Sequence, residues 1–277
     1  MENKDTKLDT KNVKNIANSL RQKFGTNLQS VYLPCLNKKL YFKAITVGQQ
    51  KTISKILIEA GGDSAKIYLG LLGMIQGLCT EPIDFTVMNE FERIKIMVEL
   101  FGHNYLNEAL TLTCGNCKHE FTHKINFTQV GNALDTAYVA PSEVELLHTT
   151  ETGETIPFKF GIGYPMVPIT NAYMAIIAKD ANRPSGLNEE FLKLFINSID
   201  ITLDGNTEHV VAADCDITEF LAIIDELPVT LFMGKSGLMS IISERYFKKL
   251  DNLLPDLKCP NCASPIEGAL SIVSFFQ

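Results

Sequence analysis

Two short stretches decide how this chain folds: TLTCGNCKHEFTHKINF at residues 111–127 and LKCPNCASPIEGALSIVSFFQ at residues 257–277. Each contains a Cys-x-x-Cys turn. Two such turns are the usual halves of a four-thiolate zinc site, because each turn points both of its sulfurs at one ion. We therefore expect one structural zinc ion per chain, held by four ligands: Cys114, Cys117, Cys259 and Cys262.

The long interval between the two pairs shapes the fold. Position 259 lies 142 residues beyond position 117, whereas a compact zinc ribbon separates its pairs by roughly 15 to 20 residues. The two turns can therefore meet only through the tertiary fold. The sequence predicts a zinc-ribbon-like module formed by two distant knuckles, and loss of the metal should unfold at least that module.

The same spacing also occurs in thiol-disulfide oxidoreductases, where the first cysteine begins a helix after a strand. Here β-type alternation flanks the first pair on both sides, so a redox enzyme is the second hypothesis. A disulfide within either pair is disfavoured in a reducing compartment. A catalytic zinc ion would need an open coordination position, which four cysteines do not leave.

Other potential ligands have simpler interpretations. His119 and His123 lie near the first pair and could replace a thiolate, but ordinary strand positions explain them better. The remaining cysteines occur singly among apolar neighbours and are interpreted as core residues: Cys35, Cys79 and Cys215.

Outside the knuckles, most of the hydrophobic pattern has helical periodicity. A hairpin is expected around Asn37, because two β-rich runs flank it. Strands are expected at 144–148, 155–160 and 199–203. Helices are expected at 10–24, 47–60, 64–79, 86–102, 172–179, 188–196, 216–226 and 233–253. The sequence thus predicts an α+β fold that is mainly helical, with short β-hairpins.

The pattern divides the chain into four regions. These are an N-terminal amphipathic arm (1–28), a hairpin with helices and the first knuckle (29–129), a mixed α/β middle region (130–215), and a helical region with the second knuckle and an apolar tail (216–277). The arm either packs on its own domain or docks on a neighbour.

Composition narrows the class of protein. The 277 residues are 45% hydrophobic and 21% charged, which is typical of a folded globular chain. The 25 basic residues against 32 acidic ones give a net charge of −7, which disfavours nucleic acid as a partner. No nucleophile elbow, Walker-type loop or H-E-x-x-H motif occurs. The sequence therefore predicts a protein that is not an enzyme.

Four segments in this order resemble the baseplate hub proteins of T4-like contractile-tailed bacteriophages: LPCLNKKLYFKAITVGQQKTISKILIEA, IDFTVMNEFERIKIMVELFG, TLTCGNCKHEFTHKINF and LKCPNCASPIEGALSIVSFFQ. The resemblance covers roughly residues 33–127 and 216–277. Two positions depart from the family pattern: Ala44 stands where a proline is expected, and Ala263 stands where a glycine is usual.

The resemblance implies a structural or assembly role in the central baseplate hub. It places the protein in the host cytoplasm during assembly and allows a place in the virion tail. The implied partners are other hub or tail proteins, with homo-oligomerisation as an option, and neither nucleic acid nor membrane. The apolar tail either completes the zinc module as a strand or anchors a neighbouring subunit through Leu270, Ile272, Val273, Phe275 and Phe276.

Overall fold

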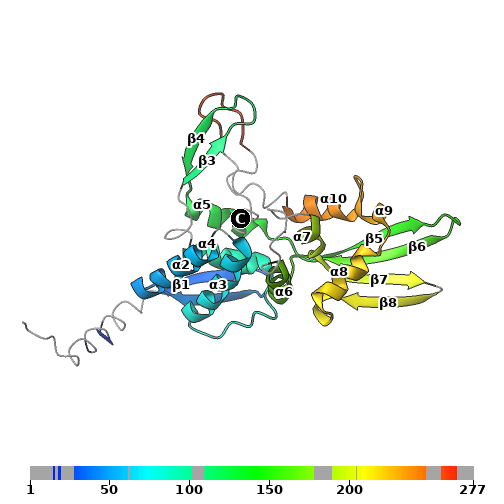
Figure 1. The fold of residues 1–277 in the computed structure, drawn as a ribbon, viewed down its shortest axis with the longest axis horizontal. Helices are drawn as coiled ribbons and strands as arrows, with labels where there is room; N and C mark the ends of the chain where they lie inside the picture. The colour runs from blue at the N-terminus through cyan, green and yellow to red at the C-terminus, as the bar shows by residue number, and fades with distance from the viewer. Residues whose placement is uncertain are drawn as a thin grey trace, which may run out of the picture.

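The computed structural model describes residues 28–61, 63–101, 109–177, 189–203, 205–247 and 257–266, together with residues 15, 18 and 19. The last three are helical and exposed, and apart from Leu28 they are all that is described of the predicted arm. The predicted tail contacts at positions 270–276 lie outside the described residues. Figure 1 shows an elongated molecule, with a hairpin projecting from its middle.

The first unit begins with the expected hairpin. Strand β1 (Leu28–Leu33) pairs antiparallel with β2 (Lys38–Lys43), and the turn places Asn37 at a φ of 47°. Asparagine tolerates this left-handed conformation better than most residues. The side chains on the inner face of the hairpin are buried: Val31, Leu33, Leu40 and Phe42. They belong to one of the two hydrophobic clusters among the described residues.

Three helices pack against this hairpin: α2 (Val47–Ala60), α3 (Ser64–Leu78) and α4 (Glu90–Phe101). Helix α2 begins with a capping box, in which Thr46 accepts a hydrogen bond from the backbone N–H of Gln49 and Gln49 accepts one from that of Thr46. It ends at Gly61, whose φ of 58° suits glycine. Helix α4 is buried almost all round, and its buried charged residues are Glu90, Glu92, Arg93 and Lys95.

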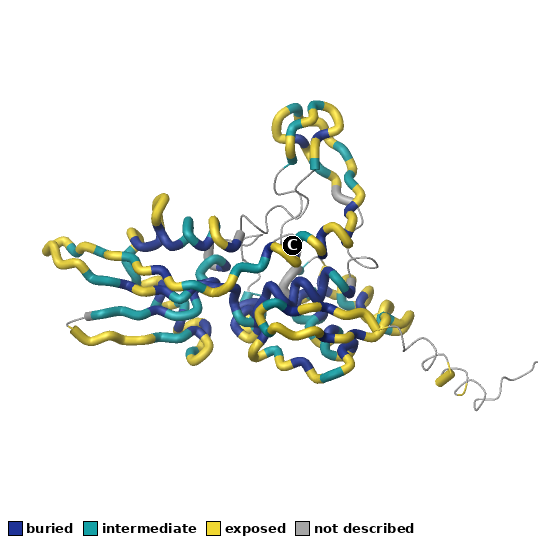
Figure 2. Tube along the Cα trace, turned by 180° about the vertical axis from the view of Figure 1, so that it is seen from behind, coloured by how far each residue is buried: buried dark blue, intermediate teal, exposed yellow. Residues whose placement is uncertain are grey.

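The projecting hairpin consists of β3 (Ala109–Thr113) and β4 (Glu120–Lys124). The chain then enters α5 (Phe127–Ala137), whose first N–H groups are capped by Asn126. Figure 1 shows the red segment, residues 257–266, lying against the tip of this hairpin. Figure 2 shows that the tip is mostly exposed, far from the dark blue cores of the body.

The second unit is a four-stranded antiparallel sheet in the order β5-β6-β7-β8. Its strands are β5 (Ser142–Thr149), β6 (Thr155–Ile162), β7 (Ile196–Leu203) and β8 (Asn206–Val211). Helix α6 (Val167–Ile177) contacts α3, α4 and α8, so it joins this unit to the first. The remaining helices are α7 (Glu189–Lys193), α8 (Ile217–Asp225), α9 (Val229–Phe232) and α10 (Leu238–Ile242).

The prediction of a mainly helical chain with only short hairpins is wrong. The fold is mixed, and the strands of the middle region form one continuous sheet that carries much of the larger core. Strand β8, with the sequence NTEHVV, was not predicted, because its first four residues are polar. It is an edge strand of the sheet. The predicted helix at 188–196 is shorter, because α7 ends at Lys193 and β7 begins at Ile196.

The long helix expected at 233–253 is also absent from the described residues. Gly234 has a φ of 94°, so the chain turns before α10 begins. A single π-helical turn, Ser243–Phe247, follows α10, and Tyr246 within it is fully buried. The hydroxyl of Tyr246 donates to the carbonyl oxygen of Ile162, 2.9 Å away, which fixes this turn against the sheet.

Candidate metal centre

The two Cys-x-x-Cys turns share one backbone design. In the first, the N–H of Lys118 donates to the carbonyl of Cys114 at 3.0 Å, and in the second the N–H of Ala263 donates to the carbonyl of Cys259 at 2.9 Å. Lys118 and Ala263 both have a left-handed φ, 58° and 57° respectively. Each turn therefore curls its two cysteines toward the same side.

The four cysteine sulfurs gather where the two turns face each other. All four Sγ atoms lie within 4.8 Å of one another. The Sγ atoms of Cys114 and Cys262 are 3.6 Å apart, as are those of Cys117 and Cys259. A tetrahedral ion with Zn–S bonds of about 2.3 Å requires sulfurs about 3.8 Å apart. The cluster thus has the donor type and the dimensions of a four-thiolate zinc site.

Polar side chains from each turn reach across to the other. The amide of Asn116 donates to Oγ of Ser264 at 3.0 Å, and the amide of Asn261 donates to Sγ of Cys117 at 3.6 Å. These contacts were not predicted from the sequence, although both turns have the pattern Cys-x-Asn-Cys, with asparagine at the same position. Hydrogen bonds from side chains that do not themselves bind the metal orient the side chains that do.

The surroundings change the acidity of the thiols in opposite directions. The hydrogen bond with Ser264 is the main cause that lowers the pKa of Cys262 to about 6, and the amide of Asn261 lowers the pKa of Cys117. Burial raises the pKa of Cys259 to about 11. A bound cation would favour the thiolate of Cys259 against this burial.

The other potential ligands lie elsewhere. Among the described residues, the group that could hold a metal contains four cysteines and no histidine. The ring of His119 stacks on Phe121 instead, with centroids 6.2 Å apart. Cys79 is buried in the core of the first unit, as expected, and Cys215 is half-buried against the larger core. Cys35 is exposed, so its interpretation as a core residue is wrong.

A comparison with known protein families gives a match that covers nearly the whole chain. A family model described as T4 bacteriophage base plate protein matches residues 26–277. The chain belongs to this family. The baseplate resemblance drawn from the two knuckles and the first helices is therefore confirmed, and the match includes the middle region that the resemblance did not cover.

Family membership gives this baseplate protein a structural role in the phage tail and places it among other tail or baseplate proteins. No curated protein and no solved structure matches the chain. Within the described part of this baseplate protein, no helix combines the length and apolar character needed to cross a bilayer.

Proposed function

We propose that the chain is a component of the central baseplate hub, or a factor that builds the hub, and that it acts through protein contacts rather than catalysis. The match over residues 26–277 carries the baseplate part of this proposal. The hub part is supported by the resemblance of the first hairpin, the helices after it and the two knuckles to hub proteins. Assembly takes place in the host cytoplasm, with neither nucleic acid nor a membrane as a partner.

The proposal includes one structural zinc ion, bound by Cys114, Cys117, Cys259 and Cys262. The supporting observation is the cluster of four sulfurs within 4.8 Å at the meeting of two matched turns. The ion would hold the segment 257–266 on the tip of the β3–β4 hairpin. Four thiolates complete the coordination of zinc, so this ion would have no open position for a substrate.

A thiol-disulfide oxidoreductase is the alternative. The lowered pKa values of Cys117 and Cys262 favour it, because a low thiol pKa promotes exchange. The surroundings favour zinc, since Cys114 and Cys117 lie in a turn between two strands and not at the start of a helix. Insulin reduction separates the two functions, because a zinc-loaded structural protein should show no turnover.

The apolar tail is the proposed contact with a neighbouring subunit, through Leu270, Ile272, Val273, Phe275 and Phe276. The described segment before it, residues 257–266, lies against the exposed tip of the β3–β4 hairpin (Figure 1). An exposed projection suits a contact with another hub or tail protein.

The experiment combines native mass spectrometry with phage assembly. One zinc ion per chain is expected, and Cys259→Ser should lose the ion and block tail assembly. Deletion of residues 270–277 should keep the ion but block hub formation. A metal-free protein that catalyses insulin reduction would replace this proposal with the redox enzyme. Normal tails from phage lacking the protein would exclude the assembly role.

A further inference from the structure

The outer face of the β1–β2 hairpin is unusual for a solvated surface. Side chains alternate across a strand, so Tyr32, Lys39, Tyr41 and Lys43 share the face opposite the core. We call these four residues the tyrosine–lysine face. The two tyrosines are 47% and 43% exposed. In the described part of the chain neither lysine forms an ion pair, so both charges are available to a partner.

Tyr32 is held in place although nearly half of it is exposed. Its hydroxyl donates to Oδ1 of Asn37 at 2.8 Å, and the ammonium of Lys95 lies 5.6 Å from the centre of its ring. Lys95 is itself fixed by an ion pair with Asp135. A side chain that is already ordered loses little entropy on binding, and aromatic anchors of this kind dominate protein interfaces.

A complementary surface lies on the open face of the four-stranded sheet. Glu143, Glu145 and Leu147 alternate along β5 on the face opposite the buried Phe158 and Phe160. We call these three residues the acidic face. The side chain of Glu143 is 70% exposed and forms an ion pair with Lys159 of β6 at 2.8 Å, and Leu147 is 65% exposed. The acidic face thus offers the carboxylate of Glu145, and that of Glu143 shared with Lys159, beside an apolar side chain.

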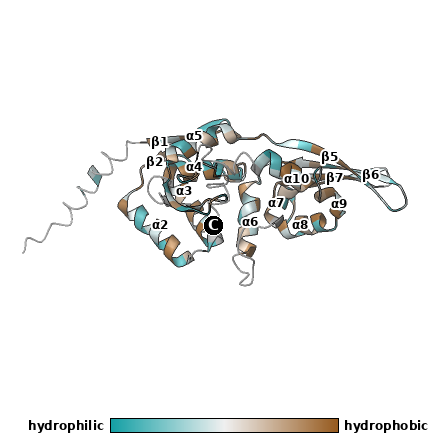
Figure 3. Cartoon of the chain, turned by 90° about the horizontal axis from the view of Figure 1, so that it is seen from above, coloured by the Kyte–Doolittle hydropathy of each residue, from teal (hydrophilic) through white to brown (hydrophobic). Residues whose placement is uncertain are grey.

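The two hairpins carry opposite charge. Residues 28–43 contain three lysines and no acidic residue, whereas residues 142–162 contain four glutamates and one lysine. Figures 1 and 3 place these hairpins at opposite ends of the body, so the two faces cannot meet within one molecule. They can meet only between copies, where complementary potentials favour association and fix its register.

We propose that the tyrosine–lysine face of one copy docks on the acidic face of a second copy. The partner is a second molecule of this chain, because its acidic face carries the negative charge and the apolar side chain that the tyrosine–lysine face needs. This contact joins different surfaces of the two partners. It therefore builds a closed ring, an open filament, or a two-fold pair in which both contacts form at once.

The test exchanges the charges. Lys39→Glu/Lys43→Glu and Glu143→Lys/Glu145→Lys should each weaken self-association by more than about tenfold in Kd, measured by sedimentation velocity on the full chain. A mixture of the two variants should restore the complex, because each then offers the face that the other lacks. Circular dichroism and zinc content establish that the variants remain folded.

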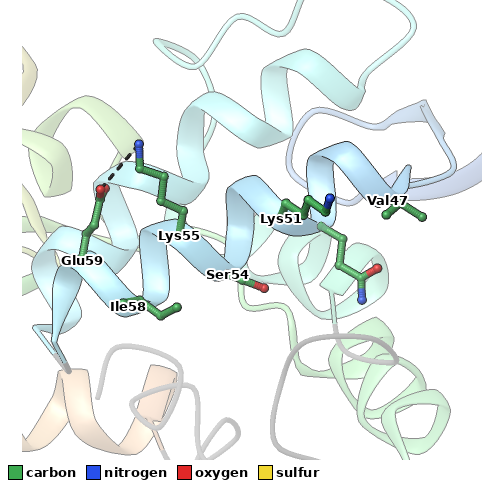
Figure 4. Close-up of a pocket in the computed structure, with 7 residues that line it drawn as sticks. Val47, Lys51, Ser54, Lys55, Ile58 and Glu59 are labelled. Atoms are coloured by element: carbon green, nitrogen blue, oxygen red, sulfur yellow. Dashed lines mark ion pairs between the residues drawn. The ribbon is translucent and has the colours of Figure 1, made fainter.

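The matched control lies on α2. Lys51→Glu/Lys55→Glu makes the same change of charge on the outer side of that helix, around the shallow hollow in Figure 4. Lys55 there pairs with Glu59 at 3.6 Å on an exposed turn, so its reversal should leave self-association unchanged.

Three results would overturn the proposal. The first is a wild-type chain that stays monomeric at its highest soluble concentration. The second is a variant mixture that associates no better than either variant alone. The third is binding of a fluorescent single-stranded oligonucleotide that is lost in Lys39→Glu/Lys43→Glu while self-association is unchanged, because it would assign the tyrosines and lysines to nucleic acid.

Discussion

Sγ of Cys117 lies 3.6 Å from Sγ of Cys259, although 142 positions of the chain separate them. The contact attaches the second knuckle to the tip of a hairpin that otherwise projects alone from the body (Figure 1). A two-stranded hairpin is marginally stable by itself in water. We therefore expect a metal ion bound by the sulfur cluster to be the main stabilising contact of this projection.

Removal of zinc should unfold the projection before the body. Chelation removes the metal ion and Cys259→Ser removes one of its ligands, and either change loses binding energy that is also folding energy. The two hydrophobic cores lie elsewhere. Hydrogen exchange should show loss of protection over β3, β4 and residues 257–266. Cys35→Ser is the control, because Cys35 is exposed and outside the cluster. Equal loss of protection in both cores would show that zinc supports the whole fold.

Ala263→Gly should stabilise the second knuckle. Ala263 has a φ of 57°, and an L-residue in this region costs about 1–2 kcal/mol. Glycine removes that cost but loses about 0.5–1 kcal/mol in backbone entropy, so a net gain of about 0 to 1.5 kcal/mol is expected in thermal unfolding of the metal-loaded protein. Ala222→Gly, within helix α8, should instead destabilise. A loss in both variants would contradict the assigned turn.

Arg93→Met should be severely destabilising. The Nε of Arg93 donates to Oε2 of Glu90 at 2.6 Å, and its guanidinium carbon lies 3.8 Å from the ring centre of Tyr68. Both charged side chains are buried, and removal of one partner of a buried pair costs about 3–5 kcal/mol. The double variant Glu90→Gln/Arg93→Met should recover much of the loss in urea unfolding. A double variant as unstable as Arg93→Met would show that packing, and not charge, dominates.

Two glycines of helix α3 should respond in opposite ways to alanine. A Cβ atom at Gly73 meets no atom within 4 Å, so Gly73→Ala should stabilise by about 0.5–1 kcal/mol. A Cβ atom at Gly70 would lie 2.6 Å from Cγ2 of Ile56 on α2. Because β-branched Ile56 has few rotamers in a helix, Gly70→Ala should cost about 1–3 kcal/mol. Denaturant unfolding measures both, and stabilisation by both would mean that α2 and α3 pack loosely.

The sequence predicted best where one short pattern determines local structure. The alternation around Asn37 predicted the first hairpin, and the helical spacing predicted both ends of α2. The cysteine spacing predicted that distant turns share a ligand set, and their sulfurs do lie together. That they bind zinc stays a prediction, as do the contacts of the tail.

The failures have a common physical origin in tertiary context. Strand β8 is an edge strand whose polar residues face solvent, so its alternation is weak. The long helix expected from residue 233 does not begin there, because Gly234 adopts a left-handed φ. A glycine in a sequence does not reveal which φ it will adopt. The hydrogen bonds of Asn116 and Asn261 join turns that are far apart in sequence, so no local pattern reveals them.

The sulfur cluster also determines how the molecule would transmit force. Residues 118–258, including the four-stranded sheet, lie between the two Cys-x-x-Cys turns. Once a metal ion joins these turns, tension between β3 and the segment after Pro265 would run through metal–sulfur bonds. The sheet would then carry no load. In a contractile tail, such a bypass would let the protein hold its neighbours under tension without unfolding its own larger core.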